Sequence, residues 1–260
     1  MTILDRIFAK KRDEVAELQA RVPRSELQAQ IADQEPTRGF SRALTNAQKP
    51  IALIAEVKKA SPSRGVIRAN FDAAELATAY ENAGAHCLSV LTDVEFFQGS
   101  VENLKIAKAV TSLPVLRKDF TTSEYHVLEA RAMGADAILL IVNGLDEEEL
   151  RGFRELAEGL QMDVIVEAHN LVEAERAIAT GAKIVGINNR NLETFEEDIE
   201  TACRVIPPLA GRALIVSESS LKSKSDVDQV AEAGAGAVLI GTTFCRADDP
   251  ESKVREVMGW

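Results

Sequence analysis

The sequence alternates short apolar runs with longer stretches in which apolar and charged positions recur at helical spacing. The apolar runs are rich in Val, Ile and Leu, a composition that is typical of buried strands. Strands are predicted at Ile51–Val57, Cys87–Leu91, Pro114–Arg117, Ala137–Val142, Val164–Val166, Ile184–Ile187, Ala213–Val216 and Ala237–Ile240. Helices are predicted at Asp72–Asn82, Val101–Val110, Ser123–Met133, Asp146–Leu160, Leu171–Thr180, Glu196–Val205 and Lys222–Ala233, and after Pro250. Because the two kinds of segment alternate strictly, the pattern predicts parallel strands joined by crossover helices.

A Gly-Ala pair followed by an apolar run marks every second predicted strand. The copies read AGAHCLSVL, MGADAILLI, TGAKIVGIN and AGAGAVLIG, with glycines at Gly84, Gly134, Gly181 and Gly234. Each glycine is placed to end a helix in a left-handed backbone conformation. Double βα units of this kind close naturally into a (β/α)8 TIM barrel, an α/β fold. A doubly wound open sheet is the competing architecture, and its dinucleotide-binding form is disfavoured because no GxGxxG follows the first strand.

The segment before Ile51 has a different pattern, without a clear strand. Apolar positions at helical spacing predict an amphipathic helix over Ile3–Leu18, and Ser25 is placed to cap a second helix that runs to Ile31. Pro36–Pro50 is predicted to be a connection. These segments bury too little apolar surface to fold alone. We therefore expect a single (β/α)8 barrel domain over residues 1–260, with residues 1–48 as an N-terminal helical extension packed on the barrel.

Composition and charge limit the partners and the compartment. Hydrophobic residues make up 46% of the 260 and charged residues 27%, as in ordinary globular proteins. The formal net charge of −11 argues against nucleic acid but leaves an anionic small molecule open, because local cations decide its binding. No apolar run could span a bilayer, so no membrane association is expected, and the charged N-terminus is not a signal peptide. The three cysteines form no CxxC pair, which predicts no metal site and a reducing compartment, the cytoplasm.

Two ionisable residues end the first predicted strand. Glu56 and Lys58 occupy positions i and i+2, which point to the same face of a strand. A charged pair at the end of an otherwise apolar strand is costly unless it is satisfied or used. Taken alone, the pair fits a structural salt bridge and an active site equally well.

The carboxyl ends of other predicted strands are polar too, and active sites of (β/α)8 barrels lie at this end. The residues found there are Lys118, Glu167, Asn188, Arg190, Glu218, Ser219, Gly241 and Thr242. Complementary groups on so many strand ends favour an active site over a solvated rim. Acids and lysines in one mouth would perturb each other's pKa values, which suits proton transfer near neutral pH.

The last two predicted strands end in the usual phosphate site of this fold. Ser219, Ser220, Gly241 and Thr242 offer backbone N–H groups and hydroxyls to an anion. Lys58 and Arg190 could add charge-assisted hydrogen bonds. The sequence therefore predicts a phosphorylated small-molecule substrate.

Several motifs, in this order along the chain, resemble those of the indole-3-glycerol phosphate synthase family of tryptophan biosynthesis. The motifs are AEVKKASPS, SVLTDVEFFQGS, LRKDF, GADAILLIV, VEAH, GINNRNLETFEED and VSES. The resemblance covers essentially the whole chain, including the N-terminal helices. It implies a decarboxylating lyase that closes the ring of 1-(2-carboxyphenylamino)-1-deoxyribulose 5-phosphate, releases carbon dioxide and water, and uses no cofactor.

The resemblance also implies a role for each matched residue. Lys118 matches the general acid that protonates the carbonyl under attack. Glu167 and Lys58 match the acid and base groups of the dehydration step. Glu56 and Glu218 match residues that hold the lysines and the substrate hydroxyls, and Asn188 matches a positioning residue. Ser61 and Arg190 match positions around the polar ends of the substrate. The residues that match the apolar wall around its aromatic ring are Pro62, Phe97, Phe120, Leu139, Leu192 and Ile240. Other enzymes of the tryptophan pathway are the protein partners that the resemblance suggests.

One departure concerns the phosphate site. The family usually has Gly after the Glu-Ser of strand seven, where this chain has Ser220. Glycine lets the backbone approach a phosphate closely, whereas serine adds a Cβ and restricts φ. We expect phosphate binding to be retained but weakened.

Three further polar residues are expected to have structural roles. Two alternative functions also stay open. Arg117 and Lys59 are interpreted as rim charges, and His169 as a loop histidine. The first alternative function is a non-catalytic or weakened barrel that binds a phosphorylated metabolite, which the intact acid and base set argues against. The second is another phosphosugar enzyme, such as a phosphoribosyl isomerase, which LRKDF and NNRNL disfavour.

Overall fold

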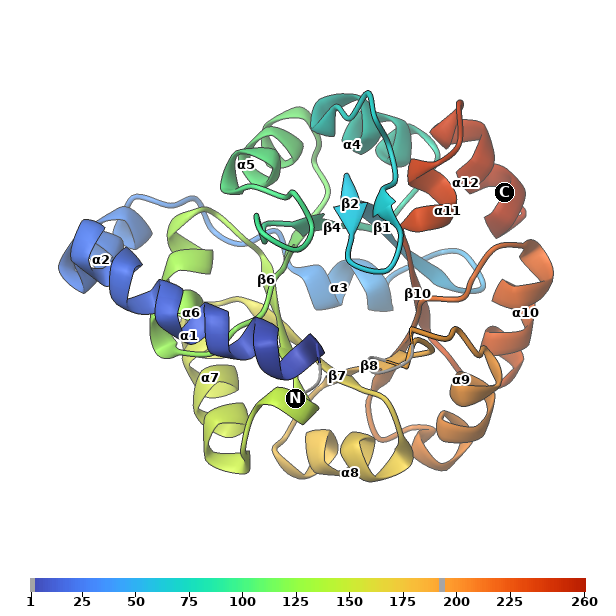
Figure 1. The fold of residues 1–260 in the computed structure, drawn as a ribbon. Coiled ribbons are helices and arrows are strands. Elements are labelled where there is room, and N and C mark those ends of the chain that lie inside the picture. Colours follow the sequence, from blue (N-terminus) through green and yellow to red (C-terminus); the bar gives the residue numbers. More distant parts are fainter. Residues whose placement is uncertain (1–2, 192–194) are drawn as a thin grey trace.

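Eight parallel strands close into a barrel in the computed structural model, which describes residues 3–191 and 195–260 (Figure 1). Each strand pairs with its neighbours in chain order, and the last strand pairs with the first. The strands are β1 (Ala52–Val57), β4 (Cys87–Leu91), β5 (Val115–Lys118), β6 (Ala137–Ile141), β7 (Asp163–Ala168), β8 (Ile184–Asn188), β9 (Leu214–Glu218) and β10 (Ala237–Ile240). The predicted TIM barrel is confirmed.

Helices cover the outside of the barrel, so most strand residues are buried on both faces. That double burial explains why the strands read as continuous apolar runs rather than as alternating ones. The covering helices are α4 (Ala73–Asn82), α5 (Val101–Val110), α6 (Glu124–Ala132), α7 (Glu147–Gly159), α8 (Leu171–Ala179), α9 (Glu200–Val205), α10 (Lys224–Glu232) and α12 (Pro250–Met258). Short helical turns are η1 (Val142–Gly144), η2 (Pro207–Leu209) and α11 (Thr242–Cys245).

The repeated glycines have the left-handed conformation that their positions predict. The φ angles of Gly84, Gly134 and Gly181 are 91° and that of Gly234 is 108°. Each lies two residues after the end of a helix and directly precedes the turn into the next strand. The repeat therefore records the same helix-to-strand connection in four places.

The residues before β1 form helices at both ends of the barrel. Helix α1 (Ile3–Arg21) lies over the opening at the carboxyl ends of the strands, while α2 (Arg24–Ala32) packs on α6 (Figure 1). The prediction that Ser25 caps α2 is wrong, because Pro23 holds the N-cap position without a side-chain bond. The predicted connection Pro36–Pro50 contains a further helix, α3 (Phe40–Thr45).

Helix α3 covers the amino-terminal end of the barrel. Phe40 is fully buried, and the backbone N–H of Ser41 donates to Asp163, the first residue of β7, at 2.8 Å. The backbone N–H of Arg38 similarly donates to Asp136, just before β6. Carboxylates at strand starts therefore fix the chain that covers this end, which leaves the opposite end open for a ligand.

The polar segment after β1 forms a small hairpin. Its strands are β2 (Ala60–Ser61) and β3 (Gly65–Val66), which pair antiparallel. The hairpin keeps Ser61 and Pro62 at the edge of the barrel opening. No helix in the described ranges 3–191 and 195–260 is long and apolar enough to cross a membrane.

Candidate active site

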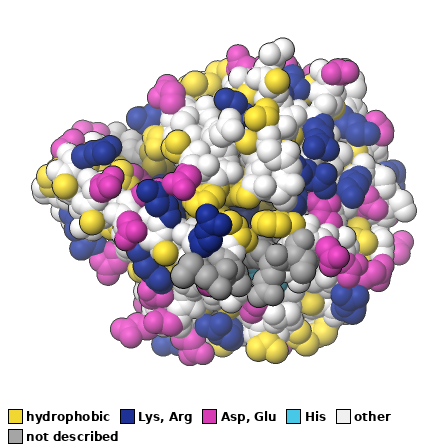
Figure 2. Space-filling view, in the orientation of Figure 1, with side chains coloured by type: hydrophobic (Ala, Val, Ile, Leu, Met, Phe, Trp, Pro, Cys, Tyr) yellow, Lys and Arg dark blue, Asp and Glu magenta, His cyan; other side chains and the backbone are white. Residues whose placement is uncertain are grey.

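A pocket opens at the carboxyl ends of the barrel strands. Residues at or just after the ends of β1, β5, β7, β8, β9 and β10 line it, together with the first turns of α1. Apolar side chains gather near the centre of this face, with basic side chains beside them (Figure 2). The pocket contains every described residue that the sequence assigns to the site, and Leu192 lies outside the described residues.

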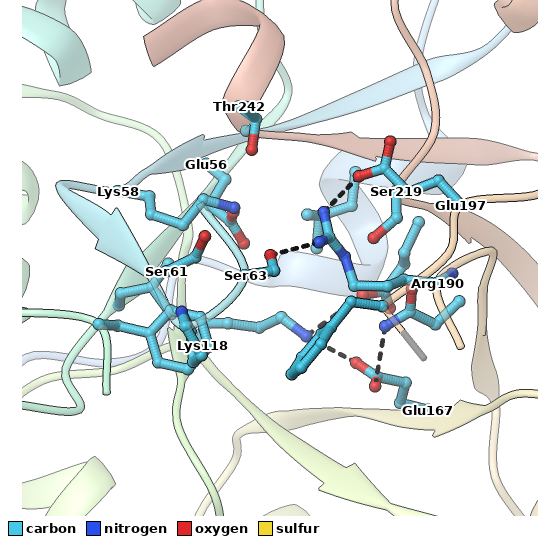
Figure 3. A pocket seen from close by; sticks show the side chains of 18 of the residues that line it. Glu56, Lys58, Ser61, Ser63, Lys118, Glu167, Arg190, Glu197, Ser219 and Thr242 are labelled. Atoms are coloured by element: carbon cyan, nitrogen blue, oxygen red, sulfur yellow. Dashed lines mark hydrogen bonds and ion pairs between the residues drawn. The ribbon is translucent and has the colours of Figure 1, made fainter. Parts of the chain in front are cut away.

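Lys118 lies at the centre of the polar part of the pocket (Figure 3). Its ammonium donates to Glu167 Oε2 at 2.6 Å and to Glu218 Oε2 at 3.2 Å. The Lys118 side chain is 15% exposed, while the two carboxylates are 3% and 2% exposed. Because these groups are largely buried, they compensate one another's charges.

This cluster shifts the pKa values of its members in opposite directions. Burial alone would lower the pKa of Lys118, but the charges of Glu167, Glu218 and Glu56 outweigh it and raise that pKa, so the ammonium is kept. Burial would raise the pKa of Glu167, but Lys118 and His169 lower it to about 2. Burial raises the pKa of Glu218 to about 7, helped by the charge of Glu167 and opposed by Lys118. Without substrate, the site therefore holds Lys118 as a cation, Glu167 as an anion and, in Glu218, an acid that titrates near neutral pH.

Glu56 and Lys58 form an ion pair at the end of β1 (Figure 3). The Glu56 side chain is 5% exposed and that of Lys58 12%. A Cβ on Gly241 would lie 2.3 Å from Glu56 Oε1, so glycine at the end of β10 makes room for this carboxylate. Gly186 on β8 does the same for Glu218, since a Cβ there would lie 2.2 Å from its Oε1.

Asn188 and Arg190 extend the site along β8 and the loop after it. Asn188 Nδ2 donates to Glu167 Oε1 at 3.1 Å, and its Oδ1 accepts from the backbone N–H of Arg190 at 3.0 Å. The Arg190 guanidinium donates to Ser63 Oγ at 2.5 Å and pairs with Glu197 (Figure 3). Sequence reasoning missed Glu197, although the NNRNLETFEED motif contains it.

The end of the pocket near β9 and β10 has the geometry of an anion cradle. Ser219 and Ser220 are both left-handed, with φ angles of 65° and 64°. The hydroxyls of Ser220 and Ser61 are buried and have no hydrogen-bond partner among the described residues. Gly241 and Thr242 line the same end, where the first N–H groups of α11 have no intrahelical partner. Within the described part of the chain these polar atoms have no partner, and the residues that carry them line the pocket, so a bound anion would satisfy them.

The apolar part of the pocket contains the predicted wall residues Pro62, Phe97, Phe120, Leu139 and Ile240. The Phe97 and Phe120 rings lie 6.0 Å apart, and Phe8 of α1 packs edge-on against Phe120 at 6.0 Å. Sequence reasoning missed further apolar residues that line the pocket, namely Ile3, Leu4, Ile7, Leu91, Ile141, Phe195, Leu221 and Leu239. Together these side chains form a slot suited to a flat aromatic ring.

A buried lysine on α1 supports the wall from behind. Lys11 Nζ lies 2.8 Å from Asp93 and 3.0 Å from Asp119, and all three side chains are at most 7% exposed. Asp119 accepts from the backbone N–H of Phe120, and Asp93 from that of Phe97. Sequence reasoning missed Lys11 because the apolar periodicity of its helix placed it among surface charges.

The interpretation of Arg117 was wrong. Arg117 is not a rim charge, because it is buried and pairs with Glu129 at 2.6 Å and Asp119 at 3.4 Å. His169 lies in the loop directly after β7, as predicted, and its Nε2 also comes within 3.4 Å of Glu167 Oε1 without forming a hydrogen bond. Within residues 3–191 and 195–260, no group of three or more His, Cys, Asp and Glu side chains could hold a metal ion.

Comparisons with known proteins agree with this architecture. A family model described as indole-3-glycerol phosphate synthase matches residues 4–257. Among solved structures, a mandelate oxidase mutant with a monooxide FMN adduct is similar, with a TM-score of 0.62, 20% identity, and coverage of 81% of this chain and 72% of that one. Thiamine phosphate pyrophosphorylase from Pyrococcus furiosus is also similar, with a TM-score of 0.61 and 14% identity, and the match covers 81% of this chain and 95% of that one. The N-acetylmannosamine-6-phosphate 2-epimerase from Clostridium perfringens has a TM-score of 0.61 and 14% identity, and the match covers 78% of this chain and 90% of that one. At these identities the solved structures share the fold alone.

Proposed function

The chain belongs to the indole-3-glycerol phosphate synthase family, and on that premise we propose that it closes the indole ring of 1-(2-carboxyphenylamino)-1-deoxyribulose 5-phosphate. The reaction joins an aromatic carbon to a ketone carbon, releases carbon dioxide and then eliminates water. Its groups match the division of the pocket into an apolar slot, a charged centre and an anion cradle.

The substrate lies across the pocket in this proposal. Its phosphate binds at Ser219, Ser220, Gly241 and Thr242, where backbone N–H groups and hydroxyls face the cavity. Its aromatic ring enters the slot between Pro62, Phe97, Phe120, Leu139 and Ile240. Arg190 and Ser61 bind the remaining polar groups. The ketone then lies between the two ends, within reach of the charged centre.

Ring closure needs a proton on the ketone oxygen. The aromatic carbon that bears the carboxylate attacks the ketone carbon, and the C=O electron pair moves to oxygen. Lys118 donates a proton to that oxygen, because it is a buried ammonium directed at the middle of the pocket. Glu167, Glu218 and Asn188 hold the lysine and the hydroxyl that forms.

Decarboxylation and dehydration follow from the same intermediate. The bond to the carboxylate breaks, its electron pair returns to the ring, and carbon dioxide leaves. The new hydroxyl then takes a proton and departs as water while a base removes a proton from the adjacent carbon. Lys58, held by Glu56, and Glu167 are the acid and base pair that we assign to this step. The whole reaction consumes one proton, since a carboxylate is replaced by neutral products.

The observation that carries the proposal is the Lys118 ammonium, bound between Glu167 and Glu218 and facing an aromatic slot. The test incubates the protein with the carboxyphenylamino substrate and follows indole fluorescence. Wild-type protein is expected to form product, and Lys118→Ala to lose at least about 100-fold in kcat. Lys183→Ala, which removes a lysine that is 74% exposed, is the matched control and should leave turnover unchanged. Substrate binding without product would favour a non-catalytic barrel, and a Lys118→Ala variant that retains turnover would show that the assigned acid is wrong.

A further inference from the structure

A second, polar cavity lies beside the pocket and shares Asn188 and Arg190 with it. Its volume of about 450 Å³ is enough for several water molecules. Exposed Asn143 and Asn170, from the segments after β6 and β7, help to line it, so it is in contact with solvent. His169 lies between the two cavities, because it lines the second cavity and also contacts Glu167.

A continuous chain of ionisable groups crosses from the active site to this cavity. Lys118 lies 2.6 Å from Glu167, and Glu167 lies 3.4 Å from His169 Nε2. The other ring nitrogen, Nδ1, lies 3.3 Å from Glu173, which also lines the cavity. The Lys118–Glu167 and His169–Glu173 contacts are hydrogen bonds, whereas His169 Nε2 forms none with Glu167 at 3.4 Å, so a small movement of the ring is needed to complete the path.

Glu173 is held in place to orient the imidazole. Its carboxylate accepts from the backbone N–H of His169 at 2.8 Å and from Asn170 Nδ2 at 2.7 Å. Asn170 in turn caps α8, so the helix start and the carboxylate are fixed together. With Nδ1 facing Glu173, the ring must present Nε2 to Glu167.

The proposed chemistry creates a need for such a path. Each turnover takes up one proton, and Lys118 is deprotonated while the substrate and its products fill the mouth of the pocket. A route that the substrate does not block would let the proton return to Lys118 before the products leave.

We propose that His169, oriented by Glu173, relays protons from the polar cavity to the Glu167–Lys118 pair during turnover. The imidazolium gives its Nε2 proton to Glu167, which passes it to the Lys118 amine. The neutral ring keeps its other proton on Nδ1, beside Glu173, and water from the polar cavity then reprotonates Nε2. His169 does not touch the reacting atoms, so it is a positioning residue, and the inference rests on the proposed function.

The charges around His169 suit this role. Burial disfavours the cation, but the hydrogen bond with Glu173 and the charges of Glu167, Glu173 and Glu218 together raise the pKa of His169. Arg190, Arg204 and Asp198, with Glu196, face the same cavity from the loop after β8 and from α9. These neighbours favour the imidazolium, which is the form that gives its proton to Glu167 in the relay.

The experiment compares His169→Gln and Glu173→Gln with wild type in steady-state assays from pH 5.5 to 8.5, with and without added imidazole. The expected result for His169→Gln is a fall in kcat of at least about tenfold, a KM within about threefold, and partial restoration of kcat by imidazole. The pH profile of kcat should also lose the ionisation that the wild type shows in this range. Glu173→Gln should shift that ionisation to lower pH, because the imidazolium loses its charged partner.

The matched control is Glu175→Gln, which removes an exposed carboxylate of the same helix and should change neither kcat nor its pH profile. A His169→Gln variant with wild-type kcat and pH profile, or a loss that imidazole does not restore, would overturn the relay while leaving the proposed function intact. Absence of product from the wild type would overturn the proposed function and the relay with it.

Discussion

Lys118 and Glu218 meet at 3.2 Å although they belong to β5 and β9, which lie on opposite sides of the barrel. The lysine spans the opening and leaves Glu218 Oε1 buried without a hydrogen-bond partner among the described residues. Because that carboxylate is incompletely satisfied, burial raises its pKa to about 7. The fold therefore maintains an acid that is costly to ionise at the centre of its site.

The stability of Glu218→Gln should depend on pH less than that of the wild type. An ordinary glutamate has a pKa of 4.5, whereas that of Glu218 in the folded protein is about 7. The stabilisation that this group contributes is therefore complete below pH 4.5 and is lost as the pH rises through 7. Glutamine carries no such cost. The free energy of unfolding of the variant minus that of the wild type, measured with urea, should therefore be up to about 3 kcal/mol larger at pH 8 than at pH 5.

The control for this experiment is Glu102→Gln, which removes an exposed carboxylate in the first turn of α5. Its free energy of unfolding should follow the wild-type pH dependence between pH 5 and 8. Equal pH dependence of wild type and Glu218→Gln would contradict the raised pKa.

Lys11→Met should destabilise the protein and weaken substrate binding. Removing one member of this buried charged network leaves Asp93 without its cation and Asp119 with Arg117 alone, which costs up to about 3–5 kcal/mol in the free energy of unfolding. Those carboxylates accept from the backbone N–H groups of Phe97 and Phe120, so the aromatic wall should loosen and KM should rise. Denaturant unfolding and steady-state kinetics measure the two effects.

The neighbouring Lys10 offers a matched control for Lys11. Its side chain is 45% exposed and makes a single ion pair with Glu95 at 3.7 Å. Exposed pairs of this kind contribute about 0–1 kcal/mol. Lys10→Met should therefore leave both stability and KM nearly unchanged, and a similar effect from the two substitutions would argue against the buried network.

The barrel itself was predictable because its signals are local. A strand–helix alternation and a repeated helix-ending glycine both lie within short stretches of chain, and the φ angles of Gly84 and Gly234 confirm the second signal. Helix α3 was missed because it spans only six residues between prolines, where length and turn residues indicate a connection. Its formation depends on Asp136 and Asp163, which are about a hundred residues away or more.

The sequence could predict those site residues that lie at the carboxyl ends of strands or share a strand face with such a residue. Lys118, Glu167 and Glu218 came from reading the carboxyl ends of strands. The same i, i+2 rule that joined Glu56 to Lys58 also joins Glu167 to His169, and applying it there would have brought His169 into the site. No local signal could reveal that Lys11 is buried, because its buried partners Asp93 and Asp119 come from the loops after β4 and β5.

Gly241→Ala should disable the site rather than the fold. The added Cβ would lie 2.3 Å from Glu56 Oε1, so the carboxylate must move and its ion pair with Lys58 must change. We expect kcat to fall at least about tenfold, since catalytic groups displaced by about 1 Å lose much of their effect. Gly152→Ala is the matched control, because its Cβ would meet nothing within 4 Å and alanine favours the α7 helix. If both variants kept wild-type kcat, Gly241 would not be needed to place Glu56.

Ser220→Gly should lower KM for the phosphorylated substrate. Ser220 has a φ of 64°, a conformation that costs a non-glycine residue about 1–2 kcal/mol. Glycine removes this strain and the Cβ, so the backbone N–H groups of the cradle can approach the phosphate more closely. Gln161→Gly, at the same φ of 64° in the turn after α7, relieves equal strain and should leave KM unchanged.

Ser220→Ala separates the two parts that serine contributes to the cradle. Alanine keeps the Cβ and the strained φ but removes the buried hydroxyl, which has no partner among the described residues. If the backbone carries phosphate binding, KM should fall for Ser220→Gly and stay close to wild type for Ser220→Ala. If the hydroxyl binds the phosphate instead, KM should rise in both variants, because each leaves one phosphate oxygen without that donor. A KM that rises or stays the same in Ser220→Gly would therefore reject the strained backbone as the weak point of the cradle.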